Sequence, residues 1–182
     1  MVTMTGSNPL IGDAEHIVHQ AWADFAGKAA DVRSIASLHE MSAHVSTNRV
    51  FQIRFTDAST LVAKVSSYGS YFLFAEDHDR LARCSSLLRH GRWAGFLADV
   101  LTVDKRPYTW YDGSCWCAFY GEVQRAESLP RVLSAADVGA LAREIARFHH
   151  ACQEISAALP SVSNSVKGDA IHLLDQLTNP FA

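Results

Sequence analysis

The sequence lacks any long hydrophobic run. A membrane-spanning helix needs about 18 or more consecutive apolar residues, and polar or charged residues interrupt every apolar stretch before that length. The N-terminus also lacks the basic and then apolar pattern of a secretory signal peptide. We therefore expect no membrane partner and a location in the cytoplasm.

Charged residues are scarce as well, at 19% of the chain, and the net charge is −3 at pH 7. Proteins that bind duplex nucleic acid present a strongly basic face to the phosphates, so nucleic acid is not an expected partner. Hydrophobic residues make up 48% of the 182 residues, which is typical of a folded chain rather than a disordered one. A chain of this length forms one domain or a pair of small lobes.

Cysteine is rare, with four in the chain: Cys84, Cys115, Cys117 and Cys152. Cys115 and Cys117 lie two residues apart in a strand-like run, so their sulfurs point to the same face. Such a pair suits a soft metal ion, but no second ligand pair follows, and no histidine has a zinc-site spacing such as H-E-x-x-H. We predict reduced thiols in a core strand and no metal site, with a thiol or metal protein as the remoter alternative.

The spacing of apolar residues predicts both helices and strands. A period near 3.6 predicts three long helices, at 13–27, 71–91 and 134–155. Alternation predicts a hairpin and further strands, at 49–55, 61–66, 96–103, 108–111 and 114–123. A short helix is predicted at 170–177, after a Ser-rich linker. Because helices and strands do not alternate regularly, a parallel doubly wound sheet is disfavoured, and the predicted class is α+β with an antiparallel sheet.

Particular residues set the predicted ends and faces of these helices. Gly27 is predicted to end the first helix, and Ser134, with Asp137 three residues on, is predicted to cap the last one. In the second helix, one predicted face holds Asp77, Leu81, Cys84 and Leu88. In the last helix, the predicted apolar stripe is Val138, Leu141, Ile145 and Phe148.

A lysine interrupts the otherwise apolar strand at 61–66. By alternation, Lys64 shares one face of the predicted hairpin with Val50 and Val62. An ammonium group on a half-apolar face needs an anion or water. Two anions are candidates: the carboxylate of Asp77 on the following helix, and a phosphate group, to which lysine lends a positive charge.

The loop before the hairpin is rich in small hydroxyl residues. Ser46 and Thr47 offer hydroxyl and backbone N–H groups at the mouth of the hairpin, where a phosphate can approach closely. Val50 and Val62 are placed to hold a flat base. The alternative interpretations are an ordinary turn at 46–48, a strand lysine whose stem packs while its amine is solvated, and helix acids that complement the helix dipole.

Four segments together resemble the N-terminal lobe of the protein-kinase-like phosphotransferases, in particular the aminoglycoside phosphotransferase and fructosamine kinase group. The segments are "STNRVFQI", "LVAKV", "FAEDHDRL" and "LAREIARFHHA". "LVAKV" resembles the lysine-bearing strand motif, and "FAEDHDRL" resembles the start of the next helix, with Asp77 at the acidic position. The resemblance covers about residues 40 to 155.

The resemblance implies a five-stranded antiparallel sheet with one packed helix at 41–124, preceded by a helical extension at 1–40. It implies that Lys64 binds the phosphates of ATP and pairs with Asp77, or with Glu76 as a substitute. Ser46 and Thr47 would lie over the phosphates, and the backbone of 118–123 would contact adenine. Residues 125–182 would be a linker and the first helices of an incomplete second lobe.

The catalytic loop of that group, H-x-D-x-x-x-x-N, is missing, and the Gly-Asp at Asp169 lacks the accompanying His and Asn. We therefore predict an ATP-binding lobe of a small-molecule kinase that is inactive alone and has no catalytic or metal-binding residue. ATP is the expected cofactor, joined by magnesium in a complete enzyme, and the acceptor substrate is unknown. The alternative is a non-catalytic interaction domain that keeps the architecture without using nucleotide. An incomplete cleft exposes apolar surface, so self-association is expected.

Overall fold

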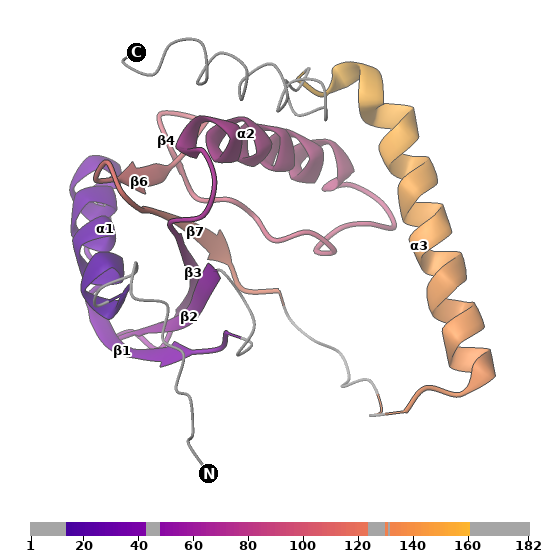
Figure 1. Cartoon of the computed structure of the whole chain (residues 1–182), viewed down its shortest axis with the longest axis horizontal. Helices are drawn as coiled ribbons and strands as arrows, with labels where there is room; N and C mark the ends of the chain where they lie inside the picture. The colour runs from indigo at the N-terminus through magenta and orange to yellow at the C-terminus, as the bar shows by residue number, and fades with distance from the viewer. Residues whose placement is uncertain (1–13, 43–47, 124–129, 131, 161–182) are drawn as a thin grey trace.

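The computed structural model describes residues 14–42, 48–123, 130 and 132–160, and Figure 1 shows their arrangement. The predicted Ser-rich linker and the helix predicted at 170–177 lie outside these ranges. No helix in this part of the chain is long and apolar enough to cross a membrane.

The fold is α+β, and its sheet is five-stranded and antiparallel, as predicted. The sheet order is β1-β2-β3-β7-β6, and β4 and β5 form a separate two-stranded hairpin. The helices are α1 Ala14–Ala29, α2 Tyr71–Leu88, α3 Ala135–Ile155 and the 3-10 turn η1 Ser156–Ala158. The strands are β1 Ile35–Glu40, β2 Asn48–Phe55, β3 Thr60–Ser66, β4 Thr102–Val103, β5 Arg106–Pro107, β6 Thr109–Tyr111 and β7 Trp116–Gly121.

The main core lies between α1 and one face of the sheet. The alternation predicted for the first hairpin is confirmed, because Phe51, Ile53 and Phe55 are all fully buried on this face. Trp22 of α1 packs on Phe55, with ring centroids 4.7 Å apart, and meets Phe119 of β7 edge-on at 5.4 Å. Aromatic contacts of this kind add to the large area that these side chains bury.

Cys117 of β7 and Cys115, which immediately precedes this strand, belong to this core. Cys117 is fully buried and Cys115 is 4% exposed, and both are free thiols. Burial raises the pKa of Cys115 to about 11, because a low-dielectric surrounding disfavours the thiolate. Both thiols are free and buried in the core, as predicted, but Cys115 lies just before the strand rather than in it.

The ends of two predicted elements were wrong. α1 passes through Gly27 to Ala29, and Ala30 ends it in the left-handed region at φ 52, where Asp31 N–H donates to Ala26 O at 3.0 Å. This bond satisfies a terminal carbonyl of the helix without a glycine. The strand predicted at 96–103 is reduced to β4 and an isolated bridge at Val100.

The reason for the shorter strand is a shared sheet edge. β6 pairs with residues 116–118 of β7, which leaves only the end of β7 for the segment at 99–101. There Leu101 N–H donates to Phe119 O at 3.0 Å, and Gly121 N–H donates to Asp99 O at 2.7 Å. Two segments therefore divide one edge, and neither forms a long strand.

The predicted inward stripe of α2 is confirmed at Leu88 and was wrong at its start, by one residue. The buried residues of this helix are His78, Ser85 and Leu88, whereas Asp77 is exposed. One residue along a helix turns the side chain by about 100°, so the buried stripe runs one position later at its start. The helix stays amphipathic, but histidine and serine occupy inward positions that the apolar pattern did not mark.

α3 begins as predicted, and the described residues leave most of its apolar stripe exposed. Ser134 Oγ accepts from Asp137 N–H at 3.2 Å, and the Asp137 carboxylate accepts from Ser134 N–H at 3.2 Å, which completes the capping box. α3 buries none of its residues. Val138, Leu141 and Ile145 are about half exposed.

Candidate functional site

The predicted site lies on the face of the sheet opposite α1. Lys64 is at the centre of β3, where it pairs with Val50 of β2 and with Ala118 of β7. Val62 follows the same alternation, so the structure brings Val50, Val62 and Lys64 onto one face. All three side chains are partly buried.

The ammonium group of Lys64 lies between an aromatic ring and a carboxylate. Its Nζ is 5.5 Å from the centre of the Phe74 ring, within the range of a cation–π interaction. Burial lowers the pKa of Lys64, and the charge of Asp77 opposes that effect. The amine is therefore partly desolvated, and one nearby carboxylate is its main electrostatic compensation.

The two acids predicted to pair with Lys64 both lie on α2. Asp77 is exposed, but its charge reaches Lys64 from the second turn of α2. Glu76 is also exposed and lies one residue earlier. The first turn of α2 holds no acid, and helix-dipole effects fall off within that turn, so the dipole interpretation does not fit these two residues.

His78 completes the layer between α2 and the sheet. It is 3% exposed, and its Nδ1 is 2.9 Å from the hydroxyl of Thr109 on β6. Its ring lies 5.4 Å from both Phe74 and Tyr120. Burial and, secondarily, the charge of Lys64 lower the pKa of His78 to about 4, so the imidazole is neutral near pH 7.

Two buried polar atoms on this side of the sheet have no hydrogen-bond partner among the described residues: His78 Nε2 and Trp116 Nε1. Trp116 is 3% exposed and packs on Phe74 at 5.5 Å. Unpaired buried polar groups are uncommon in folded proteins and call for a ligand, water or functional explanation. The sequence pattern missed both residues, although the spacing of 78, 85 and 88 along one helix face is a signal for His78.

The predicted phosphate-contacting and adenine-contacting residues are only partly described by the structure. Ser46 and Thr47 lie outside the described residues. The backbone from 118 to 121 is engaged in pairing with β3. Just beyond it, the Glu122 carboxylate accepts hydrogen bonds from Gln52 and from Thr60 on the Lys64 face. Only residues 122–123 of the predicted adenine-contacting segment lie past the end of the strand.

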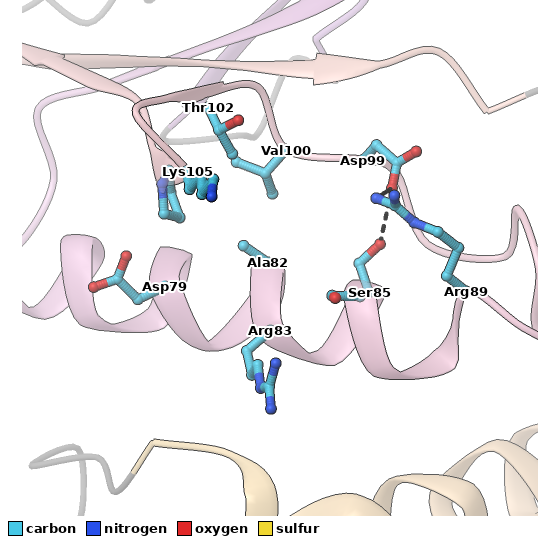
Figure 2. A pocket seen from close by; sticks show the side chains of 11 residues that line it. Asp79, Ala82, Arg83, Ser85, Arg89, Asp99, Val100, Thr102 and Lys105 are labelled. Carbon is cyan, nitrogen blue, oxygen red and sulfur yellow. Dashed lines mark hydrogen bonds and ion pairs between the residues drawn. The ribbon is translucent and has the colours of Figure 1, made fainter.

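A cavity of about 510 Å³ lies elsewhere, between α2 and the segment at 99–107 (Figure 2). Asp79 and Lys105 are toward one end of it, and Arg89 and Asp99 are at the other. Arg89 and Ser85 both donate to Asp99, at 2.9 and 3.2 Å. The cavity is lined by Asp79, Ala82, Arg83, Ser85, Ser86, Arg89, Asp99, Val100, Thr102, Lys105 and Pro107. None of the predicted site residues is among them.

In comparisons with known proteins, no family model matches the chain, and neither a curated protein nor a solved structure matches it. The kinase-like resemblance of the four sequence segments therefore stays a hypothesis. What the chain can do has to be argued from its own geometry.

Proposed function

We propose that the Lys64 face of the sheet binds ATP, as the nucleotide-binding lobe of a small-molecule kinase related to the aminoglycoside phosphotransferases. The observation that carries the proposal is the partly buried ammonium group on a central strand. Lysine is costly to desolvate, and among the described residues the charge of Asp77 offsets part of that cost in the pKa of Lys64. A phosphate group beside Lys64 supplies further compensation.

The neighbouring residues support a nucleotide rather than a bare anion. Val50 and Val62 lie beside Lys64 on adjacent strands of the same face, where they offer apolar contact to a base. Val62 is also paired across the sheet with Tyr120. A site with apolar walls and a few placed polar groups is the usual form of a small-molecule site.

The chain is proposed to bind without transferring phosphate. Phosphoryl transfer requires metal ions and a residue that orients the nucleophile. Within the described ranges no group of three or more metal-binding side chains occurs, so magnesium is proposed to arrive with the nucleotide, beside Asp77. Asp169, already set aside as a catalytic base, lies outside those ranges.

The second candidate function is a non-catalytic interaction domain. Two observations favour it. The Glu122 carboxylate bridges Gln52 and Thr60 on the same face, which puts a negative charge near the place proposed for the base. The apolar stripe of α3 is exposed at Val138 and Ile145, as an interaction surface would be.

Thermal unfolding with ligands separates the two functions. ATP with magnesium at about 100 times its Kd should raise the Tm by about 5 °C or more, because binding to the folded state adds stability by mass action. Lys64→Met keeps the apolar stem and removes the charge, so it should abolish the shift. Lys28→Met is the matched control, since Lys28 is an exposed lysine on α1, across the sheet, paired with Asp24 at 2.6 Å.

Two further ligands define specificity. Inorganic triphosphate should give a smaller shift than ATP if the base contributes, and adenosine should give little shift if the phosphates dominate. Absence of any shift with ATP in the wild type, or an equal shift in Lys64→Met, would exclude the nucleotide function and leave the interaction domain.

A further inference from the structure

Two cysteines meet where α2 contacts the end of α3. Cys84 is on α2 and Cys152 is in the last turn of α3, and Figure 1 shows the C-terminal end of α3 approaching α2. Two arginines of α2 flank the contact. Arg80 donates to Pro160 O at 3.0 Å, and Arg83 donates to Ala158 O at 3.5 Å.

Cys84 and Cys152 lie at the contact between α2 and α3, where the side chains of Arg80 and Arg83, close to Cys84 on α2, reach the chain just after α3. Both thiols are free and partly exposed. Burial raises the pKa of Cys84, and the neighbouring Cys152, through its charge and a side-chain hydrogen bond, raises it further, while Arg80 opposes both effects. Because both thiols are partly exposed, a small oxidant can reach them.

The other two cysteines provide an internal contrast. Cys117 is fully buried and Cys115 is 4% exposed, and the Cys115 thiol donates to Asp112 at 3.3 Å. Reactivity of a thiol requires access and thiolate character. Of the four cysteines, only Cys84 and Cys152 combine exposure with a thiol neighbour on a separate helix.

We propose that Cys84 and Cys152 form a reversible disulfide that joins α2 to α3. One cysteine thiolate attacks a sulfur of a low-molecular-weight disulfide such as oxidised glutathione, and the first glutathione thiolate leaves. The second cysteine thiolate then attacks the protein sulfur of the mixed disulfide, and the second glutathione leaves. The two protons lost by the cysteines go to the two released thiolates, so the protein is oxidised and glutathione disulfide is reduced.

The disulfide acts on a helix that is otherwise lightly attached. α3 buries none of its residues. It contacts the segment after α2 in two ways. Glu144 forms an exposed ion pair with Arg92 at 2.6 Å, and Phe148 packs on Trp93 and Phe96. A covalent bond to Cys84 fixes α3 to the helix that carries Asp77, two turns earlier.

Oxidation of the intact chain tests the proposal. The reduced protein is incubated with oxidised glutathione at several pH values, quenched, unfolded and labelled with a thiol reagent, and the disulfide-linked peptides are identified by mass spectrometry. The oxidised protein should take up two fewer labels than the reduced protein, with Cys84 linked to Cys152. The rate should rise with pH, and the oxidised form should melt about 5 °C or more above the reduced form, because the bond closes a long loop.

Two variants act as controls. Cys84→Ser should retain a stable glutathione adduct on Cys152, and Cys152→Ser should retain one on Cys84, because the second attack is lost in each. Full labelling of the wild type after oxidation, a bond between Cys115 and Cys117, a bond between two chains, or a persistent wild-type adduct would each overturn the proposal. An oxidised form that melts with the reduced form would overturn the attachment of α3.

Discussion

Buried His78 should make the free energy of unfolding fall as the pH is lowered below 6.5. Its pKa is lowered from 6.5 to about 4 by burial, with a smaller effect of Lys64. The folded state therefore favours the neutral ring, whereas the unfolded chain takes up a proton at the ordinary pKa. The stabilisation is fully present above pH 6.5, is lost as the pH falls, and is exhausted below about pH 4.

The magnitude follows from the two pKa values. One pKa unit corresponds to about 1.4 kcal/mol, so the full loss is about 3 kcal/mol below pH 4, and about 2 kcal/mol is lost at pH 5. This is a large share of the net stability of a domain, which is about 5–15 kcal/mol. Because His78 is only 3% exposed, solvent screening does little to reduce the effect.

The assay is urea unfolding at about pH 7.5 and about pH 5, followed by tryptophan fluorescence. His78→Phe keeps an aromatic ring among Phe74 and Tyr120 but leaves the Thr109 hydroxyl without its partner, which should cost about 1 kcal/mol at pH 7.5. Between the two pH values it should then lose about 2 kcal/mol less than the wild type. The control is His39→Phe, on an exposed position of β1.

Equal losses of stability between the two pH values in the wild type and in His78→Phe would contradict this assignment, since the buried imidazole would then not be the group that takes up the proton. If His39→Phe also weakened the pH dependence of the free energy of unfolding, the assignment to His78 would be contradicted as well. Lys64→Met provides a further check, because it removes the charge that contributes to the low pKa of His78 and should flatten the pH dependence only in part.

Two other outcomes are expected, both at α3. Ser134→Ala removes the capping box and should destabilise the start of α3 by about 1 kcal/mol; faster amide exchange in α3 with unchanged exchange in the sheet would be the result, and equal loss in both would contradict the separate packing of α3. The exposed stripe should make the chain self-associate, so the double change Leu141→Glu and Ile145→Glu should lower the mean mass in sedimentation, whereas a clean wild-type monomer would contradict the expectation.

Much of the fold was predictable because strand alternation and helix capping are local patterns. Successive side chains in 49–55 and 61–66 point to opposite faces of the sheet, so the buried face of the hairpin and the common face of Val50, Val62 and Lys64 could be assigned before any tertiary contact was known. The cap at Ser134 depends on Asp137 three residues away. Such short-range rules need no knowledge of what packs where.

Other features could not be predicted, because they depend on how elements meet. The inward turn of His78 follows from the contact of α2 with Thr109 and Tyr120. The division of the β7 edge between β6 and 99–101 follows from the path of the chain after α2. The spacing of residues 78, 85 and 88 marks one face of the helix, but only the packing shows that this face is buried.

Local patterns in the sequence were enough to assign the α+β class, the amphipathic strands and the half-apolar face that carries Lys64, since each depends on residues a few positions apart. Only the packing of the elements shows which acid lies near Lys64, which histidine is buried, and which two of the four cysteines are neighbours. The physical reason is that burial and charge interactions depend on distance in space, and residues 84 and 152 become neighbours only when α2 and α3 pack together.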